Sequence, residues 1–150
     1  RKDGLLHTSW KGRFTVINKK PLFIVDGAHN AGAADKMAES IRHYFNGKKL
    51  IYIMGVFADK EYKIVLEKTA HFAEKIYTIE TPDNPRALPA EELAKAARVY
   101  NSSAESTKSI KDAVEKAFSC AGDDENSVIL AFGSLSFIGA LTDAVEEYVG

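Results

Sequence analysis

The chain has 150 residues, of which 45% are hydrophobic, and its 20 Lys and Arg residues nearly balance 21 Asp and Glu residues, giving a formal net charge of −1. These values fit one globular domain with a real core and exclude a disordered polar tail. A near-neutral chain lacks the long-range attraction to polyanions that nucleic-acid and membrane-surface binding requires. Small molecules or proteins are therefore the expected partners.

The sequence also indicates a compartment. Its single cysteine, Cys120, cannot form an intramolecular disulfide, which favours a reducing environment and a cytoplasmic localisation. No apolar run approaches the roughly 20 residues that span a bilayer, and no signal peptide opens the chain, so we expect a soluble protein. Because the sequence starts at Arg1 rather than Met, we expect a piece of a longer protein, with residues 1–12 as a lead-in from a preceding domain.

The first elements predicted are a β-hairpin, a helix and a buried strand. Two β-type runs, 14–18 and 22–25, flank a turn that ends at Pro21. Apolar residues then recur at helical spacing over 30–45. The apolar run 50–54 is too short for a helix and fits a strand covered on both faces, which indicates a parallel sheet.

The same alternation continues to the end of the chain. The predicted elements are a helix over 62–72, a strand at 76–79, a helix over 89–97, a short edge strand at 99–100, a helix over 110–118, a strand at 128–132 and a helix over 137–148. Strands alternating with helices are typical of a doubly wound α/β fold.

Polar segments follow the predicted strands, at 26–30, 55–60, 81–86 and 133–136, and the first two of them are also glycine-bearing. Ligands of open parallel sheets bind outside the carboxyl ends of the strands, so these segments are expected to meet at one ligand-binding edge. Each segment also has a structural explanation, because Asp, Asn, Ser and Gly are common in turns and helix caps.

Asp26 and His29 are the strongest single candidates. A carboxylate directly after a buried strand, such as Asp26, suits the hydroxyls of a ribose, although a turn aspartate is the alternative. His29 fits a ligand contact or a loop histidine equally well, whereas His7, His43 and His71 are expected on the surface or on helix faces. No spacing of histidines and carboxylates suggests a metal site, so none is expected in this chain.

The known phosphate-binding signatures are absent from the sequence. Neither G-x-G-x-x-G nor G-x-x-x-x-G-K-[ST] occurs anywhere in the chain. The chain alone is therefore not expected to cradle a nucleoside triphosphate and its magnesium ion in the usual way, and would hold only part of such a ligand.

Five motifs nevertheless occur in an informative order. They are Trp10-Lys11-Gly12-Arg13, Asp26-Gly27-Ala28-His29-Asn30, Gly55 through Asp59-Lys60-Glu61, Pro85-Arg86, and Gly133-Ser134-Leu135-Ser136-Phe137-Ile138-Gly139. With them the chain resembles, over essentially all of its length, the C-terminal domain of folylpolyglutamate synthase/dihydrofolate synthase in the Mur ligase superfamily. The Asp-Gly-Ala-His-Asn string is the most specific of the five.

The resemblance implies a Rossmann-like three-layer sandwich with a mostly parallel, six-stranded sheet that includes one antiparallel strand, over residues 13–150. It also implies a missing N-terminal domain that carries the P-loop and most of the contacts to ATP and Mg²⁺. In this family ATP phosphorylates a carboxylate of folate or dihydropteroate, and the amine of L-glutamate attacks the acyl phosphate. The fragment alone is expected to be inactive.

The resemblance assigns roles to individual residues. Arg13 would face the ATP phosphates, Asp26 would accept the ribose hydroxyls, and His29 would contact nucleotide, glutamate or the neighbouring domain. Lys60 and Ser134 would hold the carboxylate of the incoming glutamate, a task that suits an ammonium and a hydroxyl. Of these, we take Arg13, His29 and Lys60 as the catalytic residues.

Two positions depart from the family pattern, and two other functions remain open. Lys11 stands where the family commonly has Pro, and Glu61 stands where it often has Asp. A peptidoglycan Mur ligase domain is the neighbouring alternative, although its strand-end motif usually differs from Asp-Gly-Ala-His-Asn. A non-catalytic α/β binding module is the alternative from another class.

Overall fold

The computed structural model describes residues 8–150, and its centre is one seven-stranded sheet with the order β1-β2-β3-β7-β4-β5-β6. The strands are β1 (Thr8–Trp10), β2 (Phe14–Lys19), β3 (Leu22–Val25), β4 (Lys49–Met54), β5 (Ala73–Thr78), β6 (Glu105–Ser106) and β7 (Ser127–Phe132). From β3 to β6 all neighbouring strands are parallel, while β2 pairs antiparallel with both β1 and β3.

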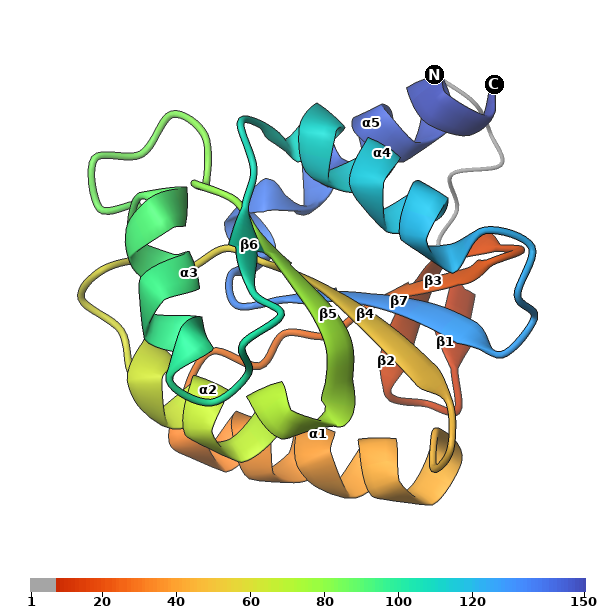
Figure 1. Cartoon of the computed structure of the whole chain (residues 1–150), viewed down its shortest axis with the longest axis horizontal. Helices are drawn as coiled ribbons and strands as arrows, with labels where there is room; N and C mark the ends of the chain where they lie inside the picture. The colour runs from red at the N-terminus through yellow and green to blue at the C-terminus, as the bar shows by residue number, and fades with distance from the viewer. Residues whose placement is uncertain (1–7) are drawn as a thin grey trace.

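Helices cover both faces of the sheet (Figure 1). They are α1 (Ala31–Tyr44), α2 (Tyr62–Thr69), α3 (Ala90–Arg98), α4 (Ile110–Ala121) and α5 (Ile138–Val149). Helices α1 to α3 pack on one face around Met37, Leu66 and Leu93, and α4 and α5 pack on the other around Val114 and Leu141. The predicted three-layer α/β fold is therefore confirmed. In the described part of the chain, no helix has the length and apolar character needed to cross a membrane.

The main predicted elements are also confirmed. The hairpin forms between β2 and β3, and β7 is buried along its whole length. Helix α1 begins where expected, because the side chain of Asn30 accepts a hydrogen bond of 2.9 Å from the amide of Ala33. His43 and His71 lie exposed, as predicted, whereas the prediction for His7 falls outside the described residues.

Two predictions about the edges of the sheet are wrong. The sheet has seven strands rather than six, because Thr8–Trp10, within the expected lead-in, pairs with β2. No strand forms at residues 99 and 100. The amide of Tyr100 donates to Ala97 in the turn that ends α3, and Val99 is 76% exposed. The edge strand on this side is β6 instead.

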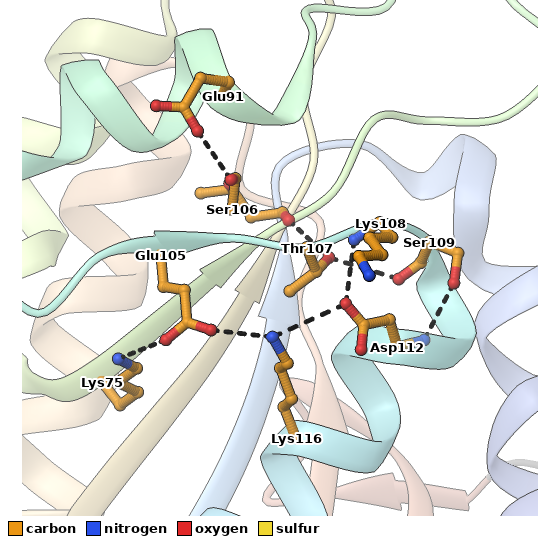
Figure 2. A network of polar contacts seen from close by, with 10 residues as sticks. Lys75, Glu91, Glu105, Ser106, Thr107, Lys108, Ser109, Asp112 and Lys116 are labelled. Carbon is orange, nitrogen blue, oxygen red and sulfur yellow. Dashed lines mark hydrogen bonds and ion pairs between the residues drawn. The ribbon is translucent and has the colours of Figure 1, made fainter.

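Strand β6 is only two residues long and is anchored mainly by side chains (Figure 2). The Glu105 carboxylate lies 2.9 Å from the ammonium groups of both Lys75 and Lys116. The Ser106 hydroxyl donates to Glu91 over 2.7 Å. Hydrogen bonds from Lys75 and then Lys116 lower the pKa of Glu105. The network thus joins α3 and α4 to the edge of the sheet.

The loops that follow β4 and β7 approach each other closely. Gly133 has a φ of +115°, and a Cβ at this position would collide with the carbonyl oxygen of Gly55. Because β4 and β7 are neighbouring strands, only glycine fits where their two loops meet. This contact fixes the path of the backbone from Gly133 into Ser134.

Glu105→Gln should lower the free energy of unfolding by about 0.5–1 kcal/mol at pH 7, a modest value because the side chains are partly exposed and water screens the pair. A carboxylate with a lowered pKa stabilises the fold above its unfolded pKa and loses this contribution on acidification. The difference between wild type and variant should therefore shrink as the pH falls below about 4.5. Urea unfolding across this range tests the prediction. Glu115→Gln, an exposed change on α4, is the control and should be as stable as wild type. Equal stability of Glu105→Gln and wild type at pH 7 would contradict the prediction.

Gly133→Ala should destabilise the chain by about 2–4 kcal/mol, because it adds backbone strain to a steric collision. Gly139→Ala is the matched control, since its Cβ meets no atom within 4 Å and lies in α5. That variant should be as stable as wild type or slightly more stable. Chemical denaturation of both proteins decides, and a tolerated alanine at 133 would refute the steric argument.

Candidate functional site

The candidate site lies at the carboxyl edge of the sheet, where three neighbouring parallel strands end. Asp26 follows β3, Gly133 follows β7 and Gly55 follows β4. The Asp26 amide donates to Ala131 over 3.0 Å, and the Gly55 amide donates to Phe132 over 3.3 Å. The three loops therefore leave the sheet side by side, as Figure 1 shows for their strands.

A pocket of about 260 Å³ opens between these loops, and it is lined by His29, Phe57, Lys60, Arg86, Gly133, Ser134 and Leu135. The structure thus brings together three predicted site residues, His29, Lys60 and Ser134. They come from segments far apart in the sequence, and the order of the strands makes them neighbours.

The three residues present different chemistry to the pocket. Nδ1 of His29 lies 2.9 Å from the carbonyl oxygen of Gly27 and donates to it, which leaves Nε2 free. The Ser134 hydroxyl lies 2.8 Å from that of Ser136 and accepts from the Ser136 amide over 3.2 Å. Lys60 is exposed and forms no ion pair with any residue of the described range 8–150. An ammonium and a hydroxyl can therefore donate to an anionic group of a small ligand, while Nε2 of His29 can accept from an N–H group of the same ligand.

Arg13 and Asp26 form a second part of the site. Their side chains meet at 3.5 Å, and the other carboxylate oxygen of Asp26 accepts from the Ala28 amide over 3.0 Å. Burial raises the pKa of Asp26, and the Arg13 charge and the Ala28 hydrogen bond offset this only in part. Nε of Arg13 is buried and has no partner among the described residues. The pair lies beside the pocket rather than among the residues that line it.

Arg86 is a pocket residue to which the sequence assigned no role. Its guanidinium makes two hydrogen bonds of 3.1 Å to Asp59 and lies 4.6 Å from the centroid of the Phe57 ring. The amide of Ala58 also donates to the Arg86 carbonyl over 2.7 Å. In the sequence, only its place in the Pro85-Arg86 motif singled out Arg86. These contacts fix the loop that carries Lys60 against the loop that follows β5.

The two residues that depart from the family pattern, Glu61 and Lys11, both make defined contacts. Glu61 accepts a hydrogen bond of 3.0 Å from the amide of Ala31, so it ties the loop after β4 to the start of α1. Lys11 has a φ of 58°, and its ammonium lies 5.4 Å from the centroid of the Trp10 ring. Neither residue is among those that line the pocket.

The polar groups at this edge suit anions better than a metal ion. Among residues 8–150, no three His, Cys, Asp or Glu side chains lie where they could share a metal ion. The Arg13 guanidinium, on a side chain that is 28% exposed, suits an anion, and the small exposed rim of Asp26, 6% of the residue, suits a hydroxyl donor.

Comparisons with known proteins show which family the chain is similar to. The model of the family "Mur ligase, glutamate ligase domain" matches residues 12–135. The dihydrofolate synthase/folylpolyglutamate synthase of Bacillus subtilis is 28% identical over 137 residues, which are 91% of this chain and 31% of that protein. The chain thus spans about a third of the length of this relative.

Solved structures give the same result for the fold. The folylpolyglutamate synthase of Mycobacterium tuberculosis matches 95% of this chain and 33% of its own, with a TM-score of 0.75 and 24% identity. A bifunctional folylpolyglutamate synthase/dihydrofolate synthase matches 92% of this chain and 32% of its own, with a TM-score of 0.74 and 25% identity. With the family match over residues 12–135, these findings show that the chain belongs to the family of Mur ligase glutamate ligase domains.

Proposed function

We propose that this chain is the C-terminal domain of an ATP-dependent ligase that adds L-glutamate to folate, and also to dihydropteroate, through an acyl phosphate. The observation that carries the proposal is the pocket in which Lys60, Ser134 and His29 meet at the carboxyl edge of the sheet. A preceding domain of the same protein would supply the P-loop and the Mg²⁺ ligands, since the sequence contains no P-loop.

The pocket suits the amino-acid substrate. The Lys60 ammonium and the Ser134 hydroxyl can both donate to a carboxylate, and such charge-assisted hydrogen bonds are short and strong. The Nε2 atom of His29, left free by the bond from Nδ1 to Gly27, can accept a proton from the amine. The related bifunctional synthase was solved with Mn, AMPPNP and L-glutamate bound, which supports a glutamate site in proteins of this kind.

The Arg13–Asp26 pair suits the nucleotide. The Mycobacterium tuberculosis relative was solved with ADP and AMPPCP. ATP, when bound, supplies the phosphoryl group. In this chain the guanidinium of Arg13, on a side chain that is 28% exposed, would contact a phosphate oxygen, and Asp26 would accept a ribose hydroxyl at its exposed rim. Asp26 also holds Arg13 in place for this contact.

The proposed reaction has two steps, phosphorylation of the folate carboxylate and attack by the glutamate amine. A carboxylate oxygen of the folate attacks the γ-phosphorus, and ADP leaves. The glutamate nitrogen then attacks the acyl carbon, a C–N bond forms, inorganic phosphate departs, and the amine proton passes to a base. Because water would hydrolyse the acyl phosphate, amine and anhydride must be held together in a closed site.

We place this reaction, which consumes ATP and glutamate, in the cytoplasm.

Substrate comparison on the full-length protein tests the proposal. With ATP, Mg²⁺ and L-glutamate, we expect amide product from a folate or dihydropteroate, none from a UDP-muramyl peptide, and none from the 150-residue chain alone. Product only from the UDP-muramyl peptide would make the protein a peptidoglycan ligase. No product from either acceptor would favour a non-catalytic binding module, and product from the isolated chain would remove the need for the preceding domain.

Lys60→Ala in the full-length protein should raise the KM for glutamate by about tenfold or more and leave the KM for ATP nearly unchanged, because a charge-assisted hydrogen bond to glutamate is lost. Steady-state kinetics with each substrate varied in turn gives both values. Lys63→Ala removes an exposed ammonium three positions away, outside the pocket, and should change neither constant. An effect of Lys60→Ala on ATP alone would contradict the glutamate assignment.

A further inference from the structure

A second pocket, of about 280 Å³, lies at the opposite, amino edge of the sheet. Its lining includes two aromatic residues, Trp10 and Tyr44, three lysines, Lys19, Lys20 and Lys48, and one carboxylate, Glu125. The hairpin between β2 and β3, the end of α1 and the start of β7 form its walls. No residue of the proposed ligase site contributes to it.

One wall of this pocket is a fixed aromatic cluster. The Trp10 ring stacks on Phe45 with 5.0 Å between centroids and 14° between planes, and it meets Tyr44 edge-on at 5.4 Å. Phe45 is buried, while Trp10 and Tyr44 are partly exposed. The Lys11 ammonium lies over the Trp10 and Tyr44 rings, 5.4 and 5.8 Å from their centroids, so this wall combines aromatic surface with a further positive charge.

The other groups that face the pocket are mostly cationic. Lys19, Lys20 and Lys48 are exposed, and none of them forms an ion pair within the described part of the chain. The next residue, Lys49, shows the contrast, since its ammonium donates to the Cys120 carbonyl over 2.8 Å and lies 3.9 Å from Glu74. No carboxylate of the described range neutralises these three ammonium groups through an ion pair.

One carboxylate opposes these three lysines. Glu125 lines the pocket, and its loop is held there because the side-chain amide of Asn126 donates to the Gly47 carbonyl over 3.0 Å. A single carboxylate neutralises only part of the charge. The pocket thus combines a surplus of positive charge with an aromatic wall, which suits a flexible ligand that bears several anionic groups along a methylene chain.

We propose that this pocket binds an oligo-γ-glutamate chain. Successive carboxylates would pair with Lys19, Lys20 and Lys48, and the methylene groups between them would pack on Trp10. The preference for a polyanion follows from the pocket alone, whereas the choice of oligoglutamate rests on the proposed ligase function, whose product carries one more glutamate than its substrate. A site of this kind retains the product at a distance from the ligase pocket.

Trp10 makes the proposal directly measurable, because it is the only tryptophan in the chain. Tri-γ-glutamate added to the 150-residue chain, without ATP, should give a saturable change in tryptophan fluorescence that weakens with added salt. The double variant Lys20→Gln/Lys48→Gln should weaken binding about tenfold or more, and Glu125→Gln should tighten it. Lys36→Gln, an exposed change on the outer side of α1, is the matched control and should have no effect.

Further measurements separate the alternatives. Absence of a saturable change, or equal affinity in wild type and the double lysine variant, would overturn the proposal. Binding of tripolyphosphate without binding of tri-γ-glutamate would also overturn it, in favour of a phosphate ligand. Lys60→Ala must leave the fluorescence titration unchanged, and a loss of binding in that variant would place the ligand in the ligase pocket instead. Because no step needs catalysis, failure here leaves the proposed ligase function untouched.

Discussion

The candidate site depends on how closely the backbone approaches itself where β4 and β7 end. Gly133 lies against the carbonyl of Gly55, in a conformation and at a distance that no side chain permits. This contact sets the direction in which Ser134 and the loop bearing Lys60 leave the sheet. The pocket is therefore positioned by two buried neighbouring strands, and a site supported in this way holds its groups more accurately than one built from surface loops alone.

The buried carboxylate of Asp26, at this edge of the sheet, has a cost in stability. Its pKa is raised because burial disfavours the charge more than the Arg13 guanidinium and the Ala28 amide favour it. The ionised carboxylate thus lowers the stability of the folded chain at neutral pH relative to an ordinary aspartate. A buried charge without a net structural benefit is common at functional sites. The same cost is expected of the ribose contact proposed for Asp26, and a simple turn residue is the alternative that the sequence left open.

Local patterns in the sequence predicted the buried half of the fold and the position of the site. Apolar runs identify β4 and β7, and the rule for strand ends then leads to Asp26 and Ser134. The sheet edges were not predictable in this way. The two residues of β6 show no apolar pattern. Glu105 in this strand is instead bound by Lys75 and Lys116, which lie 30 and 11 positions away in the sequence. The sequence predicts the hairpin of β2 and β3, but not the register that places Thr15 opposite Val25 and so brings Arg13 close to Asp26.

The near-zero net charge conceals an uneven distribution of charge. Glu105 is shared between two lysines, so that part of the surface is neutralised internally. Lys60 at the carboxyl edge and Lys48 at the amino edge have no ion-pair partner in the described range, and each lines a pocket. In physiological salt such charges act only over about 8 Å. A balanced composition therefore argues against long-range attraction to nucleic acid, but it is fully compatible with two separate sites that each bind a small anion at short range.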